Sequence, residues 1–475
     1  MFRHNGALWH VLSLLVLGLL LPLLFFIDQR TERLGLNGAL VWLILLYCAF
    51  QASRPLVRNE RRIMEMTFWL FTYVFMGIIP LVQISANRYA WPGTYDDPLI
   101  TRSLLLTLLG MAFYHAGVRW GGRRMEGTPP SVFRPLRMSA SAYMLIGFGA
   151  TALSAALLVQ SGSYRSLFLP RNSSYSEFAE KSQALIADQL IKVPIFVCLA
   201  LGVILWKAGA FRTAGPKRMT ALLLAGCLVL SNPISTARFW FGSVALTLAM
   251  LTAAWGKRSY LLWLAGYLAL FIVVFPYADL FRNELDVSVE PVKISEVMET
   301  KGDYDAFQML LNTVQYVDRS GDAHGRQLLG ALLFWVPRSV WHDKPVGSGQ
   351  HVAEAIGYDF TNLSSPLWAE AYINFGYAGV PILFALYGYL SGRLQSRFLE
   401  AVRCGYATRY HLLVPFLSAY QFFLLRGDLM NGIAYLSSFI LFSLLFTWGG
   451  RPAAAKLPRT ERAAPLGGGG PEPSP

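Results

Sequence analysis

The residues best suited to chemistry lie in one mixed aromatic and basic segment, residues 334–345. Within it, Arg338, His342 and Lys344 stand among apolar residues and the tryptophans Trp335 and Trp341. Tryptophan favours the interface between lipid tails and water, and long basic side chains there reach toward phosphate head groups. The segment therefore predicts a site at a membrane surface for an anionic ligand, and a lipid-linked phosphate is the natural candidate.

The chain as a whole has the composition of an integral membrane protein. Of its 475 residues, 54% are hydrophobic and only 15% are charged. Apolar runs of roughly 17–25 residues, the length that crosses a hydrocarbon core as a helix, recur along it. We expect an all-α polytopic membrane protein with about 12 transmembrane helices, placed at 7–27, 36–51, 64–84, 99–117, 140–159, 192–208, 219–237, 239–255, 259–276, 366–390, 410–425 and 431–449.

The placement of basic residues predicts the topology. The net charge of +13 is spread over loops instead of forming one stripe, so a nucleic acid is not an expected partner. With both ends in the cytoplasm, the basic clusters fall on short inner loops, as the positive-inside rule requires. The predicted divisions are membrane helices over 1–276, a long external loop over 277–365, membrane helices over 366–450, and a disordered Pro/Gly/Ala-rich cytoplasmic tail over 451–475.

The long external loop is predicted to contain helices of its own. Val292 to Glu299 and Tyr304 to Val317 favour helix, the second with apolar residues at three- and four-residue steps. Leu328 to Val336 is too short to span a membrane and too apolar for a free loop. We expect an interfacial or re-entrant helix there, ended by Pro337.

Several arginines are predicted on the external side. Arg238 and Arg426 fall almost inside helix ends, where a cation is costly unless it is paired or lines a wet cavity. Such a residue marks a functional site or reaches out to lipid head groups, and the sequence favours neither. Guanidinium groups present a planar fork of donors that suits phosphate, so several together could hold a diphosphate without a metal. No spacing typical of a metal site stands out.

A diphosphate held by arginines could be the leaving group when a hydroxyl attacks the sugar carbon that carries it, and this reaction needs a nearby base. Glu370 lies just inside the predicted outer end of the helix at 366–390, and His351 and Glu354 come shortly before it. Transfer of a glycosyl group to a hydroxyl needs a base near the acceptor. Glu370 is a candidate for this role, and the alternative that it is a structural counter-ion to an arginine carries equal weight.

Several motifs together resemble the oligosaccharide repeat-unit polymerases, the Wzy-type O-antigen polymerases. The resemblance runs from about residue 230 to 390. Its motifs are Ser231-Asn232-Pro233 with Arg238, Asp279-Leu280-Phe281-Arg282, the Phe334–Trp341 segment with Asp343-Lys344-Pro345, and Glu370-Ala371-Tyr372-Ile373-Asn374-Phe375-Gly376.

The resemblance implies a GT-C-like membrane glycosyltransferase of the bacterial inner membrane, with its active site facing the periplasm or cell exterior. It would join undecaprenyl-diphosphate-linked oligosaccharides into a surface polysaccharide (O-antigen, capsule or exopolysaccharide), without metal or cofactor. A chain-length regulator and a flippase are the implied partners. By the same resemblance, the diphosphate ligands would be Arg238, Arg282, Arg338, Lys344 and Arg426, and the catalytic residues Glu370, His351 and Arg338.

Two other functions are weighed against the polymerase. An O-antigen-type ligase would use the same donor with a different acceptor, so the sequence separates it poorly. A lipid-linked oligosaccharide flippase or exporter is expected to carry ionisable residues at mid-membrane and an internal repeat. Here the polar residues gather on one external side and no repeat is visible, which disfavours a transporter.

Overall fold

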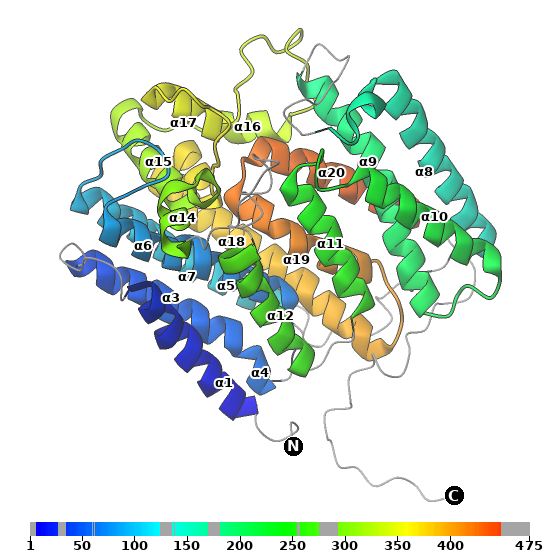
Figure 1. The fold of residues 1–475 in the computed structure, drawn as a ribbon, viewed down its shortest axis with the longest axis horizontal. Helices are drawn as coiled ribbons and strands as arrows, with labels where there is room; N and C mark the ends of the chain where they lie inside the picture. The colour runs from blue at the N-terminus through cyan, green and yellow to red at the C-terminus, as the bar shows by residue number, and fades with distance from the viewer. Residues whose placement is uncertain are drawn as a thin grey trace, which may run out of the picture.

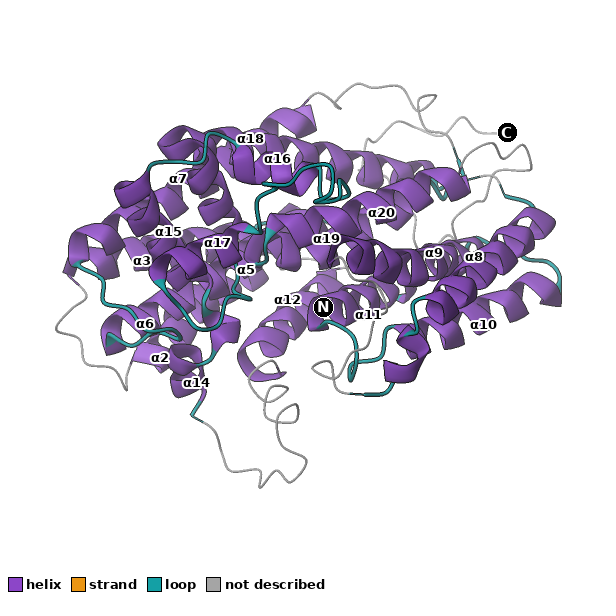
Figure 2. Ribbon diagram, turned by 90° about the horizontal axis from the view of Figure 1, so that it is seen from above, coloured by secondary structure: helices purple, strands orange, loops and turns teal. Residues whose placement is uncertain are grey.

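The computed structural model describes residues 6–26, 35–58, 60, 62–123, 135–136, 138–169, 181–253, 257–274 and 293–447. These residues form a helical bundle with no β-strand among them (Figures 1 and 2). The helical segments are α1 (Gly6–Leu15), η1 (Val16–Leu20), α2 (Leu21–Phe26), α3 (Gly35–Ser53), α4 (Pro55–Arg58), α5 (Ile63–Tyr73), η3 (Val74–Ile78), α6 (Ile79–Ala86), α7 (Asp97–Arg123), α8 (Ala140–Gln160), η5 (Ser163–Ser166), α9 (Lys181–Lys207), α10 (Ala214–Leu230), α11 (Arg238–Thr252), α12 (Lys257–Ala269), η7 (Leu270–Val274), α14 (Ile294–Thr300), η8 (Gly302–Tyr304), α15 (Ala306–Ser320), α16 (Arg326–Leu332), α17 (Ser348–Ile356), α18 (Leu367–Cys404), α19 (Tyr410–Arg426) and α20 (Leu429–Thr447).

Every predicted span overlaps a helix or consecutive helical segments, but the span predicted at 219–237 is helical only as far as Leu230, where α10 ends. In the described part of the chain, 8 helices are long and apolar enough to cross a membrane. The other predicted spans fall on α10, α11, α12 with η7, and α19, and three of these helices are only 17, 15 and 17 residues long. The all-helical, multi-span architecture is therefore confirmed. The larger number of spans and the GT-C-like arrangement stay predictions.

The helices pack around two hydrophobic cores. One core is built largely by α3, α5, α6, α7 and α18, and nearly all residues of the span formed by α5, η3 and α6 are buried within the bundle. The other lies among α8–α11, α19 and α20. Both views place α8, α9 and α10 on one side of α19, with α3, α6 and α7 on the other (Figures 1 and 2). Helices α19 and α20 thus join the two halves.

Helices α7 and α18 approach each other closely along a seam of glycines. A Cβ atom at Gly388 would lie 2.1 Å from the Tyr114 carbonyl oxygen, and one at Gly117 would lie 2.3 Å from the Ala385 carbonyl oxygen. Gly121 and Gly392 are equally crowded, at 2.2 and 2.3 Å from facing carbonyl oxygens. Small residues four apart on both helices let the backbones touch, a common means of helix association within membranes.

Helix α18 is broken near its start, and a neighbouring loop donates hydrogen bonds to the carbonyl groups that the break leaves without helical partners. Gly376 adopts φ +54 and ψ −142, a conformation open essentially to glycine alone. The carbonyl groups of Ile373 and Asn374 therefore leave the helical ladder, and they accept hydrogen bonds from the backbone N–H groups of Ala323 and Gly325 at 2.7 and 2.9 Å. The short helical piece from Leu367 to the break is thereby tied to the α15–α16 connection.

The predicted helices of the external loop appear as α14 and α15, close to their predicted bounds. Helix α16 differs from its prediction, since it ends at Leu332 and not at Val336. The chain instead turns from Leu333 to Pro337, and the Lys344 amino group donates to the carbonyl oxygens of Phe334 and Val336 at 2.6 and 2.9 Å. Pro337 lacks the N–H that would bond to the Leu333 carbonyl in a helix, and its ring would clash with that carbonyl, which explains the early end.

The glycine seam predicts a contrast between two Gly→Ala substitutions. Gly388→Ala forces α7 and α18 apart, so we expect a loss of about 1–3 kcal/mol in stability, seen as a lower Tm in detergent. The control is Gly149→Ala inside α8, where no heavy atom lies within 4 Å of the new Cβ, so the Tm should stay equal or rise. Equal losses of stability in both variants would contradict the close approach of α7 and α18 at these glycines.

Candidate functional site

One acidic turn pairs with both of the arginines predicted at helix ends. The turn is η8 with the following Asp305. Arg238, at the start of α11, donates from Nη1 to Asp303 Oδ2 at 2.6 Å. Arg426, at the end of α19, donates from Nη2 to the Gly302 carbonyl oxygen at 2.8 Å and to Asp305 Oδ1 at 3.1 Å. The fold therefore brings Arg238 and Arg426 to one place and supplies each with a carboxylate.

Asp305 is the more buried of the two acids. Only 1% of its surface is exposed, and besides Arg426 it accepts hydrogen bonds from Trp91 Nε1 at 3.1 Å and from Ser364 Oγ at 2.6 Å. A buried carboxylate needs such partners, since leaving it unpaired is costly. One hydrogen-bond donor of Arg426 is not engaged, since its buried Nε has no hydrogen-bond partner among the described residues.

Glu370 lies on the short first piece of α18, and its hydrogen-bond partner Leu429 follows Arg426 by three residues. Glu370 is 2% exposed, and it accepts hydrogen bonds from Ser348 Oγ at 2.7 Å and from the Leu429 backbone N–H at 3.0 Å. Within the described parts of the chain, no arginine forms an ion pair with it. The counter-ion interpretation of Glu370 thus finds no support, and the carboxyl group is held by neutral donors.

Asp428 completes a pair of buried carboxyl groups with Glu370. It accepts from the backbone N–H groups of Gly349 at 3.2 Å and Met430 at 2.8 Å. The starts of α17 and α20 therefore both point at this pair, and helix N-termini favour negative charge. A Cβ at Gly347 would lie 2.1 Å from Asp428 Oδ2, so glycine is needed there for the close approach.

His351 lies one turn into α17, on the same helix that begins at Ser348. Its Nε2 is 2.9 Å from the Tyr316 hydroxyl, and the two rings meet edge to face. Burial lowers the pKa of His351, while Glu354 opposes the shift and Arg326 adds to it. The neutral imidazole is therefore favoured at neutral pH, which suits hydrogen bonding better than binding an anion by charge.

The other predicted ligands lie apart from this network. Arg338 is exposed on the turn after Pro337, and no ion pair to it occurs among the described residues. Lys344 is buried, and its bonds to backbone carbonyl oxygens fix the 334–344 segment. Arg282 lies outside the described residues. The structure thus gathers Arg238, Arg426 and Glu370, and leaves Arg338 on the surface.

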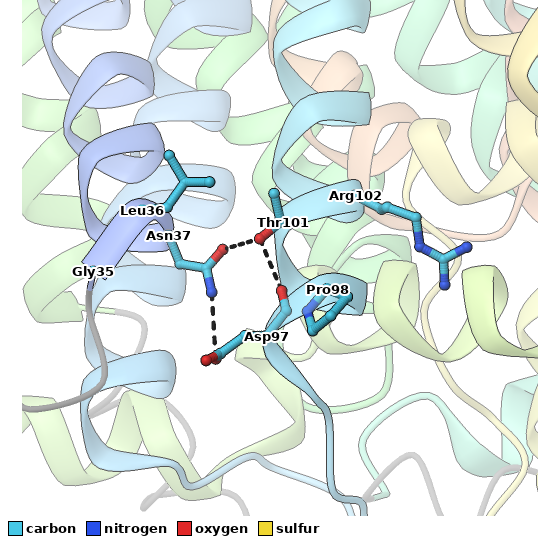
Figure 3. Close-up of a pocket in the computed structure, with 7 residues that line it drawn as sticks. All are labelled: Gly35, Leu36, Asn37, Asp97, Pro98, Thr101 and Arg102. Atoms are coloured by element: carbon cyan, nitrogen blue, oxygen red, sulfur yellow. Dashed lines mark hydrogen bonds between the residues drawn. The ribbon is translucent and has the colours of Figure 1, made fainter.

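Two cavities lie away from these residues. One, of about 460 Å³, opens between the starts of α3 and α7, where Asn37 stands between Asp97 and Thr101 (Figure 3). These hydrogen bonds join the start of α3 to the start of α7, so the polar residues that line the cavity have a structural role. Arg102 at its edge pairs with Asp318 of α15 at 2.6 Å. The second cavity lies on the other half of α7.

Sequence reasoning missed the acidic partners of the site. Asp303 and Asp305 belong to Gly302-Asp303-Tyr304-Asp305, the acidic start of a helix predicted for its apolar face. Asp428 directly precedes an apolar run, a pattern typical of a helix N-cap. Both signals are visible in the sequence, but nothing in it places them against particular arginines.

The two ion pairs predict unequal effects on stability. Arg426→Ala strands Asp305, whose side chain is 2% exposed, so we expect a loss of about 3 kcal/mol. Arg238→Ala removes a pair whose side chains are 25% and 26% exposed, which is expected to cost at most about 1 kcal/mol. Thermal unfolding in detergent compares the two variants. An equal loss of stability in both, or a larger loss in Arg238→Ala, would show that Asp305 does not depend on Arg426.

Comparison with known proteins bears on the region that holds this network. Residues 239–456 match the family model of the O-antigen polysaccharide polymerase Wzy, which confirms the resemblance seen in the motifs. The curated proteins and the solved structures give no match. The matched region includes Glu370, Arg426 and the acidic turn, together with α18, α19 and α20. Over these residues, slightly less than half of the chain, the protein is similar to the O-antigen polysaccharide polymerase Wzy family.

Proposed function

We propose that this protein joins undecaprenyl-diphosphate-linked oligosaccharide repeat units into a surface polysaccharide on the outer face of the bacterial inner membrane. The family supports polymerase-type function and a multi-pass membrane protein in general. The observation that carries the proposal is the buried Glu370, held by neutral donors, one of which, the Leu429 N–H, lies three residues after Arg426. The proposed base and Arg426 thus both lie in the region that matches the family model.

In the proposed reaction, an acceptor hydroxyl of one repeat unit attacks the sugar carbon that carries the diphosphate of the growing chain. A carbon–oxygen bond forms to the acceptor, and the bond to the diphosphate oxygen breaks. The diphosphate leaves with the bonding electrons, and Glu370 takes the hydroxyl proton. Positioned proton transfer of this kind contributes about 10²–10⁴-fold in rate.

Arg238 and Arg426 are proposed to receive the charge that develops on the leaving diphosphate. Cations fixed where charge develops lower the barrier most in a water-poor site. Arg426 is suited to this because Nη2 holds Asp305 while Nε has no hydrogen-bond partner among the described residues. Arg338, exposed on its turn, would meet the diphosphate first, and Arg282 is proposed as a further ligand. Lys344 would act indirectly, by fixing the segment that carries Arg338.

The orientation and metal independence are also proposals. The basic clusters of the short loops place those loops in the cytoplasm by the positive-inside rule, which directs the end with Glu370 outward. Because guanidinium groups can neutralise a diphosphate, the proposed chemistry needs no metal. The expected activity therefore persists in the presence of a chelator.

The test is elongation by the purified protein of its lipid-diphosphate-linked repeat unit, with chelator present and products resolved by chain length on a gel. The wild type should give a ladder of lengthening lipid-linked glycans. Glu370→Gln keeps the shape and most hydrogen bonds of the side chain but removes the base, so elongation should slow at least about 100-fold with little change in Tm. Glu354→Gln, on the exposed face of α17, is the matched control and should elongate normally.

Other outcomes separate the alternatives. Transfer to an added glycolipid acceptor that lacks the carrier, with no ladder, would identify a ligase. No transfer with a confirmed cognate substrate would favour a flippase or exporter. Wild-type elongation by Glu370→Gln would remove Glu370 from the mechanism while leaving the polymerase assignment intact.

A further inference from the structure

A second candidate ligand site lies at the far end of α7 from the acidic turn. It is an open cavity of about 590 Å³ between α3 and α7, lined by Tyr47, Ala112, His115, Ala116, Arg119, Trp120 and Arg123. Arg119 follows the first residue of α7 by 22 positions, a distance of roughly 33 Å at 1.5 Å per residue. Helix α4, which directly follows α3, lies near the lower edge of Figure 1, on the opposite side of the bundle from α16 and α17. This cavity is therefore separate from the proposed site of sugar transfer.

The charge of the cavity is positive. Arg119 and Arg123 are four residues apart on one helix and so lie on the same face, and both are exposed. No acidic side chain forms an ion pair with either one within the part of the chain that the structure describes. Arg54 and Arg119 both lie close enough to His115 and Tyr47 to interact with them electrostatically. An anion entering the cavity would thus meet several cations and no competing carboxylate.

His115 adds a hydrogen-bond donor to these cations. Its Nδ1 lies 2.6 Å from the Tyr47 hydroxyl and 2.9 Å from the Gln51 amide nitrogen. The amide nitrogen can only donate, so Nδ1 accepts and the ring proton stands on Nε2. The imidazole is thereby fixed by α3 while its other nitrogen remains a donor.

The surroundings of the cavity resemble a lipid boundary. Trp120 is 56% exposed and packs with its ring 4.8 Å from that of Tyr389. Exposed tryptophan beside arginine at a helix end is typical of the head-group level of a membrane. Basic pockets between membrane helices on the cytoplasmic side bind phosphate-bearing lipid head groups.

We propose that this cavity binds a phosphate group presented by an anionic phospholipid of the inner leaflet. Arg119 and Arg123 hold the phosphate, His115 donates to it, and Trp120 packs against the adjoining acyl chain. The site is a lipid-binding site distinct from the site of the glycan donor and acceptor. A soluble phosphate compound offers the same chemistry, so the test separates the two sources.

The experiment counts phosphatidylglycerol retained by the full-length protein after transfer from mixed phosphatidylglycerol and phosphatidylcholine nanodiscs to mild detergent, by native mass spectrometry. Wild type should retain the anionic lipid in preference to phosphatidylcholine. The double variant R119Q/R123Q should lose affinity by about 30-fold, since each basic residue near an anionic surface contributes roughly fivefold. The charge-preserving R119K/R123K should retain most of the binding.

R218Q is the matched control, because Arg218 is an exposed arginine on α10, away from the cavity. It should retain lipid as the wild type does, and all variants should unfold at similar temperatures in phosphatidylcholine alone. Equal retention by wild type and R119Q/R123Q would overturn the proposal. Stabilisation of the wild type by inorganic phosphate but not by phosphatidylglycerol would overturn the lipid assignment in favour of a soluble anion.

Discussion

The need to give every buried charge a local partner governs the end of this protein that carries the candidate site. Asp305 is almost fully enclosed, and it is stable there because a guanidinium, a hydroxyl and an indole N–H all reach it. Among the described residues Glu370 has no such cation, and it is held by a serine hydroxyl and the start of α20. These contacts join segments far apart in sequence, so satisfying the charges also fixes how the connections between helices sit on the bundle.

The same constraint separates rigid from adaptable parts of the proposed site. Helix α18 is clamped to α7 by facing glycines, and its first turns are held by the α15–α16 connection through the carbonyl groups freed at Gly376. Glu370 therefore stands on a well-supported element. Arg238 and Arg426 instead stand at helix ends, where each is paired with a carboxylate of the acidic turn.

Sequence alone predicted the helices well and the contacts poorly. Hydrophobic runs reveal spans such as 64–84 because an apolar stretch of that length has few other stable states in a membrane. Arg238, Arg426 and Glu370 were found because ionisable residues at membrane helix ends are unusual. Their partners Asp303, Asp305 and Asp428 were missed, because pairing between residues far apart in the sequence leaves no trace in spacing. The four-residue glycine steps at Gly117 and Gly388 were readable, but which helix faces which was not.

The proposed function requires the diphosphate of the glycan donor to bind at the end of the bundle that holds Arg426 and Glu370. Photocrosslinking tests this with a lipid-diphosphate donor analogue that carries a photoreactive group beside the diphosphate, followed by mass spectrometry of the labelled peptides. We expect labels in residues 302–305, 334–344 and 426–430, and competition by unlabelled donor should abolish them. Competed labels confined to the α3–α7 cavity or to the α8–α10 helices would contradict this placement of the diphosphate.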